Sequence, residues 1–139
     1  MPTRKAEANW SGTLTDGEGN LSLESGAYDG PYDYMSRFEE GETTNPEELI
    51  GAANAGCFLM ALSNELDGAG YDPEDLHVEA EVHLHPEDLA IDWIELTLEA
   101  SVPDIDEETF QEIANGAKEN CPVSKALAGV DIRLDASLV

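Results

Sequence analysis

The chain has 139 residues, 41% of them hydrophobic and 27% charged, which fits one globular domain over residues 1–139 and excludes a disordered chain. Acidic residues outnumber lysine and arginine by 31 to 6, which gives a formal net charge of −25. A nucleic acid or an anionic membrane surface would repel such a chain, so we expect neither as a partner.

The N-terminal MPTRKAEANW lacks the apolar segment of a signal peptide, and no apolar run approaches the roughly 20 residues of a membrane span. We therefore expect a cytoplasmic protein. The acidic residues are spread from Glu7 to Asp135 and form no single tail. This pattern predicts a solvated acidic surface whose self-repulsion is screened by salt, and so indicates the high-salt cytoplasm of a halophile.

Residues 6–14 and 19–24 predict two strands, joined by the turn Asp16-Gly17-Glu18-Gly19. Residues 26–44 are rich in Gly, Asp, Tyr and Glu, and predict irregular structure with a short strand around Tyr34–Phe38.

A long helix is predicted next, with Asn45 as its N-cap and Pro46 at its first position, and it ends at Asp67-Gly68. Along its apolar body Asn54 is the one plainly polar residue. A helix that is apolar on all sides is typical of a buried element, so we expect Cys57 to lie inside the protein on a central helix.

The second half of the chain predicts alternating strands at 76–85 and 91–102, a helix at 107–118 capped by Asp106, a short helix to about Leu127, and a strand at 130–138. The whole pattern predicts an α+β fold in which an antiparallel sheet wraps around a long buried central helix.

One face of the 76–85 strand carries only polar side chains, namely His77, Glu79, Glu81, His83 and His85. Neighbouring histidines could bind a metal ion, but a solvated polar face explains the pattern better, and we expect neither a metal nor a cofactor.

Cys57 and Cys121 are the two cysteines of the chain. In a reducing compartment they are either two unrelated buried thiols, the interpretation that their number alone favours, or a transient catalytic pair. An apolar helix would leave Cys57 inert unless a cation lay beside it, and Arg37 is the cation close upstream. Cys121 precedes Pro122 at a helix start, which favours a thiolate. Position alone leaves open which thiol reacts first.

The segments around these residues resemble one family. SRFEEGETTNPEELIGAANAGCFLMAL (36–62) and KENCPVSKAL (118–127) are similar to the OsmC/Ohr family, the osmotically inducible and organic hydroperoxide resistance proteins. ANWSG (8–12), LSLESG (21–26) and DIRLDASL (131–138) fit too, so the likeness covers nearly the whole chain. The R-F-E-x-G stretch around Arg37 resembles the OsmC branch more than the Ohr branch, while Asn54 and Gly56 stand where relatives more often carry other residues.

The resemblance implies a thiol-dependent peroxidase that reduces organic hydroperoxides, with hydrogen peroxide as a further substrate, in oxidative and osmotic stress defence. Cys57 would be the peroxidatic residue, which becomes a sulfenic acid, and Cys121 the resolving one, which forms a disulfide with it. Arg37 would hold the Cys57 thiolate and Glu47 would orient Arg37. A dithiol such as dihydrolipoamide would be the reductant, and the family's fold is an intertwined homodimer.

Helix geometry is compatible with a site shared between two subunits. Glu47 and Cys57 are ten residues apart on one predicted helix, which corresponds to about 15 Å along its axis. Either Arg37 bridges much of that gap or the second subunit supplies the pair, and an interface site is the simpler solution.

Two other functions are weighed against the peroxidase. A non-catalytic stress or small-ligand-binding protein could keep the same fold, but the joint presence of Arg37, Glu47, Cys57 and Cys121 argues against it. A hydrolase that uses Cys57 would need a histidine near the thiol, and none lies close to either cysteine in the sequence.

Overall fold

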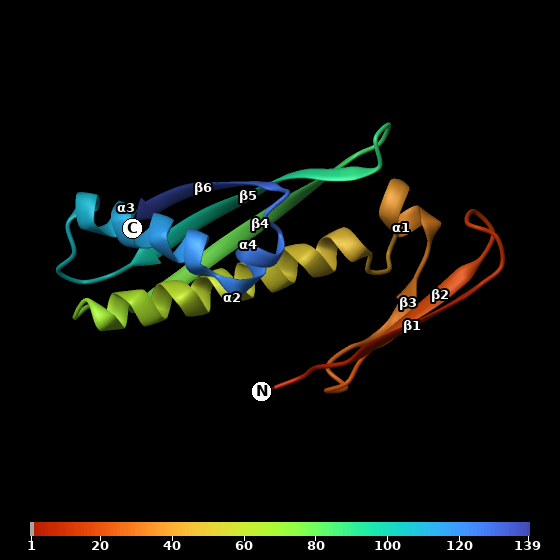
Figure 1. Ribbon diagram of the computed structural model, residues 1–139, viewed down its shortest axis with the longest axis horizontal. Helices are drawn as coiled ribbons and strands as arrows, with labels where there is room; N and C mark the ends of the chain where they lie inside the picture. Colours follow the sequence, from red (N-terminus) through yellow and green to blue (C-terminus); the bar gives the residue numbers. More distant parts are fainter. Residues whose placement is uncertain (1) are drawn as a thin grey trace. The chain divides into compact units, whose positions relative to one another are not determined.

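The computed structural model describes residues 2–139 (Figure 1), and the chain divides into two compact units, Met1–Leu49 and Ile50–Val139. Each unit has its own three-stranded sheet. The α+β class predicted from the sequence is confirmed. One domain over residues 1–139 stays a prediction.

The first unit contains an antiparallel sheet of β1 (Ala6–Ser11), β2 (Glu18–Leu23) and β3 (Asp29–Tyr32). The predicted hairpin between the first two strands is confirmed. Gly19 pairs with Trp10 on one side and with Tyr32 on the other. A Cβ atom at Gly19 would lie 2.6 Å from the Trp10 ring and 2.5 Å from the Tyr32 ring. The glycine therefore leaves room for the two rings to meet edge to face, with centroids 5.4 Å apart.

The short strand predicted around Tyr34–Phe38 is wrong, because these residues form the helix α1 (Tyr34–Phe38). Asp33 caps this helix: its carboxylate accepts from the Ser36 backbone N–H at 2.9 Å, and the Ser36 hydroxyl lies 3.3 Å from the Asp33 backbone N–H. This reciprocal capping box satisfies N–H groups that a helix start leaves free. Local capping thus outweighs the aromatic content that suggested a strand.

The second unit contains most of α2 (Pro46–Gly68), followed by β4 (Asp75–His85), β5 (Ala90–Ser101), α3 (Glu107–Asn120), α4 (Pro122–Ala126) and β6 (Asp131–Leu138). Each of these elements was predicted within a few residues of its bounds. The unit boundary falls inside α2, between Leu49 and Ile50.

The sheet of the second unit has the order β4-β5-β6, and only its β4–β5 pair is antiparallel. The β5–β6 pair is parallel, so the prediction of an antiparallel sheet is wrong for this strand. The physical reason is the connection: residues 102–130 carry α3 and α4 between the two strands, and a helical crossover of that length returns the chain in the same direction.

One face of this sheet packs against α2 and α3, which lie on the same side of it (Figure 1). The buried core takes its members from three elements: Phe58, Leu62 and Leu66 of α2, Ile94, Leu96, Leu98 and Ala100 of β5, and Phe110, Ala114 and Ala117 of α3. Burial alternates along β5 from Ile94 to Ser101, which places the polar residues Glu95, Thr97 and Glu99 on the opposite face.

The expectation that α2 is buried on all sides is wrong for this chain. The sheet covers one face only, and Ala52, Ala53, Gly56 and Met60 on the opposite face are exposed, Met60 by 77%. We call these four residues the outer face of α2. Among the described residues α2 is the one helix long and apolar enough to cross a membrane. Its packing on the sheet accounts for the apolar residues of its inner face.

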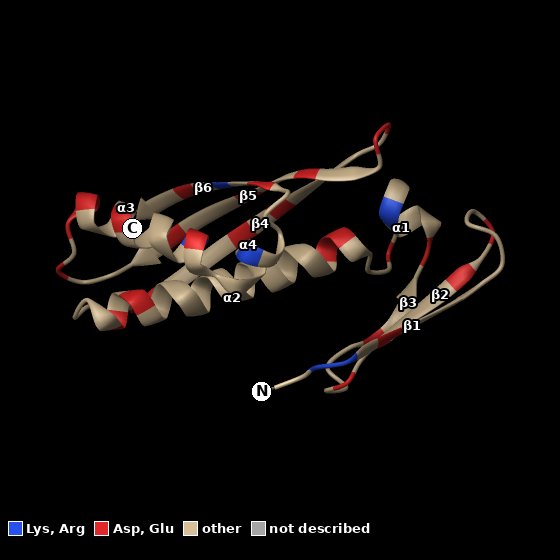
Figure 2. Cartoon of the chain, viewed as in Figure 1, with Lys and Arg blue, Asp and Glu red and all other residues tan. Residues whose placement is uncertain are grey.

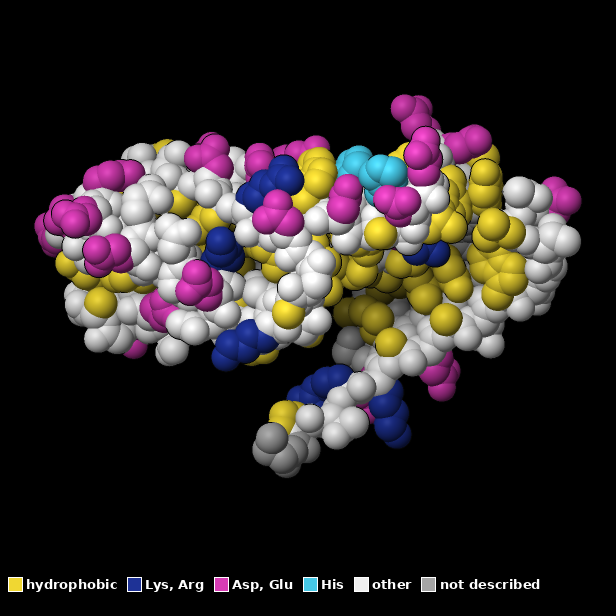
Figure 3. All heavy atoms as spheres, turned by 45° about the horizontal axis from the view of Figure 1, so that its top comes forward, with side chains coloured by type: hydrophobic (Ala, Val, Ile, Leu, Met, Phe, Trp, Pro, Cys, Tyr) yellow, Lys and Arg dark blue, Asp and Glu magenta, His cyan; other side chains and the backbone are white. Residues whose placement is uncertain are grey.

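Acidic residues occur on most elements of both units (Figure 2), as the dispersed sequence pattern predicts. The histidine side chains, cyan in Figure 3, lie among acidic neighbours on the surface in view. Within residues 2–139 no three His, Cys, Asp or Glu side chains converge as metal ligands. His83 instead pairs with Asp92 at 2.7 Å and stacks on Trp93 at a centroid distance of 4.9 Å. The His83 hydrogen bond lowers the pKa of Asp92.

Candidate functional site

Cys57 and Cys121, 64 positions apart in the sequence, come together in the second unit, where their thiols interact directly. Cys57 lies in the fourth turn of α2, and Cys121 occupies the junction where α3 ends and α4 begins. Both are free thiols. This contact removes the interpretation of two unrelated buried thiols, which the number of cysteines alone had favoured.

The surroundings of Cys121 favour its thiolate. Burial alone would raise its pKa, but the Cys57 thiol, the backbone and hydroxyl of Ser124 and the backbone of Val123 together hold the pKa of Cys121 below its ordinary value. The Cys121 side chain makes no full cap hydrogen bond to α4, so the N–H groups act on the sulfur mainly as oriented dipoles. Cys121 is 0% exposed, and solvent does not reach it.

Cys57 has the opposite character. Burial raises the pKa of Cys57, hydrogen bonding to Cys121 and repulsion from its sulfur raise it further, and the Val123 backbone partly offsets them. Yet Cys57 is only partly buried and lines a cavity of about 580 Å³. The cavity is walled by apolar and polar side chains, namely Met60, Ala61, Asn64, Glu65, Asn120 and Pro122. A small molecule can therefore reach Cys57 but not Cys121.

Arg37 and Glu47 form an ion pair in the first unit. Nε of Arg37 donates to Glu47 Oε1 at 3.0 Å, and Nη2 lies 3.0 Å from the same oxygen. Glu47 is buried and its Oε2 has no hydrogen-bond partner among the described residues, whereas the Arg37 side chain is 41% exposed. A buried carboxylate that grips one edge of the guanidinium fixes its orientation and leaves its remaining N–H groups for another partner.

The four predicted site residues thus fall into two pairs. Arg37 and Glu47 are joined in the unit Met1–Leu49, and Cys57 and Cys121 in the unit Ile50–Val139. The roles that the sequence suggested for them stay predictions.

Sequence reasoning missed Ser124 and gave Asn54 no role. Asn54 is fully buried, and its Nδ2 donates to Ser124 Oγ at 3.2 Å. The available signal was spacing, because Asn54 lies three residues before Cys57 and Ser124 three residues after Cys121. On a helix that interval places two side chains on one face.

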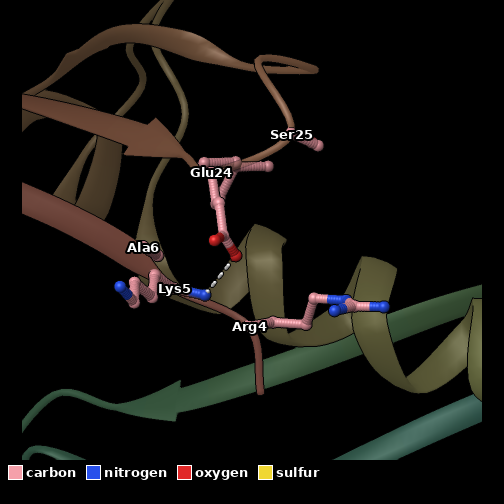
Figure 4. Close-up of a pocket in the computed structure, with 6 residues that line it drawn as sticks. Arg4, Lys5, Ala6, Glu24 and Ser25 are labelled. Carbon is pink, nitrogen blue, oxygen red and sulfur yellow. Dashed lines mark hydrogen bonds between the residues drawn. The ribbon is translucent and has the colours of Figure 1, made fainter. Parts of the chain in front are cut away.

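A second cavity lies in the first unit, lined by Arg4, Lys5, Ala6, Leu23, Glu24 and Ser25 (Figure 4). The Lys5 backbone N–H donates to Glu24 Oε2 at 3.0 Å across its floor. It holds two of the few cations of the chain, and neither cysteine lines it.

A family model described as OsmC-like protein matches residues 39–135 of the chain. Among curated proteins, Peroxiredoxin OsmC of Escherichia coli (strain K12) is 46% identical over 138 residues, covering 97% of this chain and 96% of that protein. Organic hydroperoxide resistance protein OhrB of Bacillus subtilis (strain 168) is 34% identical, covering 84% of this chain and 88% of that one.

Solved structures share the fold. An organic hydroperoxide resistance protein OsmC from Legionella pneumophila superposes with a TM-score of 0.75 at 26% identity, covering 99% of this chain and 98% of that one. The crystal structure of OhrB from Bacillus subtilis gives a TM-score of 0.69 at 29% identity, covering 96% and 98% of the two chains.

Proposed function

This chain belongs to the OsmC-like protein family and is a cysteine-based peroxidase, and from that premise we propose that it reduces organic hydroperoxides through a sulfenic acid on Cys57 and a Cys57–Cys121 disulfide. The observation that carries the proposal is the direct contact of the two thiols, of which only one faces a cavity. Defence against oxidative and osmotic stress, in the cytoplasm where a dithiol stays reduced, is part of the proposal.

Access decides which thiol attacks first. Cys121 carries the lower pKa in the resting pair, but peroxide cannot reach a fully buried sulfur. Cys57 faces the cavity, and Arg37, oriented by Glu47, is the cation that we assign to stabilising its thiolate. The same guanidinium would meet negative charge on the leaving oxygen.

The chemistry then runs in two balanced steps. The Cys57 thiolate attacks the outer peroxide oxygen, the O–O bond breaks, and the departing alkoxide takes a proton and leaves as an alcohol. Cys57 is oxidised to a sulfenic acid. The Cys121 thiolate then attacks the Cys57 sulfur and expels hydroxide, which leaves as water, and a dithiol such as dihydrolipoamide reduces the disulfide by exchange.

The cavity beside Cys57 supports an organic substrate. Met60, Ala61 and Pro122 supply apolar surface next to the thiol, which would hold a hydrocarbon group that hydrogen peroxide lacks. We therefore expect cumene hydroperoxide to be reduced faster than hydrogen peroxide, which is a secondary substrate.

A homodimer completes the proposal, with a second copy of this chain on the outer face of α2. In the most apolar stretch of α2 only 28% of the residues are buried, and a contiguous exposed apolar face on a core helix is typical of an interface. Its small residues, Ala52, Ala53 and Gly56, would let another backbone approach closely.

Thiol titration tests the reaction. One equivalent of cumene hydroperoxide should consume both thiols of the wild-type protein. The Cys57→Ser variant should keep its one remaining thiol, whereas Cys121→Ser should lose its thiol to a sulfenic acid that dimedone traps. Unchanged thiols in the wild type would instead favour a non-catalytic binding protein.

Sedimentation tests the dimer. The wild type should sediment as two copies and Met60→Glu as one, because a charge in a desolvated interface is strongly unfavourable. Ala69→Glu, at an exposed position just beyond α2, is the matched control and should stay dimeric. A monomeric wild type with full peroxidase activity would overturn this part of the proposal.

A further inference from the structure

Asn54 is a polar residue at the centre of the core helix. It is fully buried, its Nδ2 donates to Ser124 Oγ at 3.2 Å, and its Oδ1 has no partner among the described residues. Leaving a buried amide oxygen unpaired costs about 1–3 kcal/mol. An apolar residue would avoid that penalty, so Asn54 calls for an explanation beyond packing.

The Asn54–Ser124 hydrogen bond runs beside the cysteine contact. Asn54 and Cys57 share one face of α2, and Ser124 lies in the first turn of α4, which follows Cys121. The hydrogen bond therefore joins the same two elements as the thiols do. A displacement of α4 from α2 that separated the sulfurs would break the hydrogen bond as well.

The direction of this hydrogen bond determines what Ser124 can do. An amide nitrogen only donates, so Ser124 Oγ must accept with a lone pair. Its single proton is then free to point elsewhere, and the Cys121 sulfur is the neighbouring acceptor. Were Asn54 to present an oxygen instead, the Ser124 proton would turn to it and away from the sulfur.

We propose that Asn54 is a positioning residue that acts through Ser124: its amide proton occupies the Ser124 oxygen and turns the hydroxyl proton towards the Cys121 sulfur, which holds that sulfur as the thiolate that resolves the Cys57 sulfenic acid. We call the path from the Asn54 amide through the Ser124 hydroxyl to the Cys121 sulfur the relay. The assignment of Cys121 as the resolving thiol rests on the proposed function, whereas the relay itself does not.

The relay accounts for a lowered Cys121 pKa at a site where burial alone would raise it. The other titratable groups near the pair are few: the Cys57 thiol on α2 and the Glu65 carboxylate, which lines the cavity and accepts from Asn120 Nδ2 at 3.1 Å. Lys125 of α4 is exposed, and Lys118 of α3 donates from Nζ to the Ile132 carbonyl at 3.3 Å. None of these places a positive charge beside the Cys121 sulfur. Neutral hydrogen-bond donors must therefore stabilise its thiolate.

The test measures the Cys121 thiol by itself. In a Cys57→Ser background Cys121 is the one thiol left, and its ionisation is followed by the ultraviolet absorbance of the thiolate from pH 5 to 10, which needs no reagent to reach the buried sulfur. Asn54→Asp, which can only accept from Ser124, should raise the Cys121 pKa by about one unit, so that the thiolate fraction at a fixed lower pH falls about tenfold. Ser124→Ala should do the same, and Ser124→Thr, which keeps a hydroxyl, should not.

A purely structural role makes a different prediction. If Asn54 only ties α4 to α2, then Asn54→Asp and Ser124→Ala would lower the unfolding temperature and leave the pKa of Cys121 unchanged, which overturns the proposal. Should Asn54→Asp fail to fold, the Ser124→Ala and Ser124→Thr pair decides alone. No peroxide is used, so a shifted pKa in a protein that does not reduce hydroperoxides would refute the proposed function and leave the relay standing.

Discussion

Oxidation of the cysteine pair should make the protein markedly harder to unfold. The two thiols interact in the reduced state, so we expect that closing a bond between them needs little movement of α2 or α4. The disulfide would close a loop of about 65 residues, which contains β4, β5, α3 and half of α2. Tying that loop removes conformations from the unfolded chain and leaves the folded core unchanged.

The size of the effect follows from the loop. The chain-entropy relation gives about 4 kcal/mol for a loop of that length at 25 °C. An unfolding entropy of about 2.1 cal/mol/K per residue gives roughly 0.3 kcal/mol/K for the 139-residue chain. Dividing the stabilisation by this entropy predicts that Tm rises by about 10–15 °C. Strain in the native disulfide would reduce this figure.

Calorimetry of the dithiol and disulfide forms at one fixed protein concentration measures this difference. Cys121→Ser treated with the same peroxide is the control and should show no comparable rise. Non-reducing electrophoresis must show that the bond lies within one chain. An intrachain disulfide that leaves Tm unchanged or lowers it would refute the inference that the two thiols are already aligned in the reduced fold.

Three further predictions concern the rest of the molecule. Leu62→Ala should lower the free energy of unfolding by about 2–5 kcal/mol in urea titrations, because Leu62 is 0% exposed in the core, whereas Ser63→Ala on the exposed side should change it little. Potassium chloride should raise Tm between 0.1 and 2 M because it screens the net charge of −25, and an unchanged Tm would count against the high-salt interpretation. Asp106 caps α3, and hydrogen bonds from the Thr109 side chain and backbone lower its pKa from the ordinary value of 3.8. Its contribution to folding stability is therefore present above pH 3.8 and is lost as the pH falls through the lower pKa of the folded state. Asp106→Asn, which keeps a capping oxygen, should therefore flatten the dependence of stability on acid pH.

Local signals in the sequence were enough for most elements of the fold. The alternation of β4 and β5 and the caps at Asn45 and Asp106 depend only on neighbouring residues, so these elements could be predicted. The helix at Tyr34–Phe38 was missed although its signal is local, namely the capping box that Asp33 and Ser36 form.

Other features depend on distant parts of the chain. The parallel pairing of β6 and the one-sided cover of α2 follow from how elements pack, and hydrophobic pattern alone does not reveal them. The same holds for the cysteine contact. Family likeness, and not spacing, suggested that Cys57 and Cys121 act together. Spacing could place Ser124 near Cys121, but no local pattern could show that Asn54 of α2 bonds to it.

The complete burial of Cys121 beside an accessible Cys57 also bears on how the protein would be inactivated. A sulfenic acid that meets a second peroxide before it is resolved becomes a sulfinic acid, which ordinary thiols do not reduce. Only the sulfur at the cavity is open to that damage, because the other is 0% exposed. Under excess peroxide, mass spectrometry should therefore find two added oxygens on Cys57 and none on Cys121. The hidden thiol would outlast the exposed one, and it would survive in chains whose catalysis has already been lost.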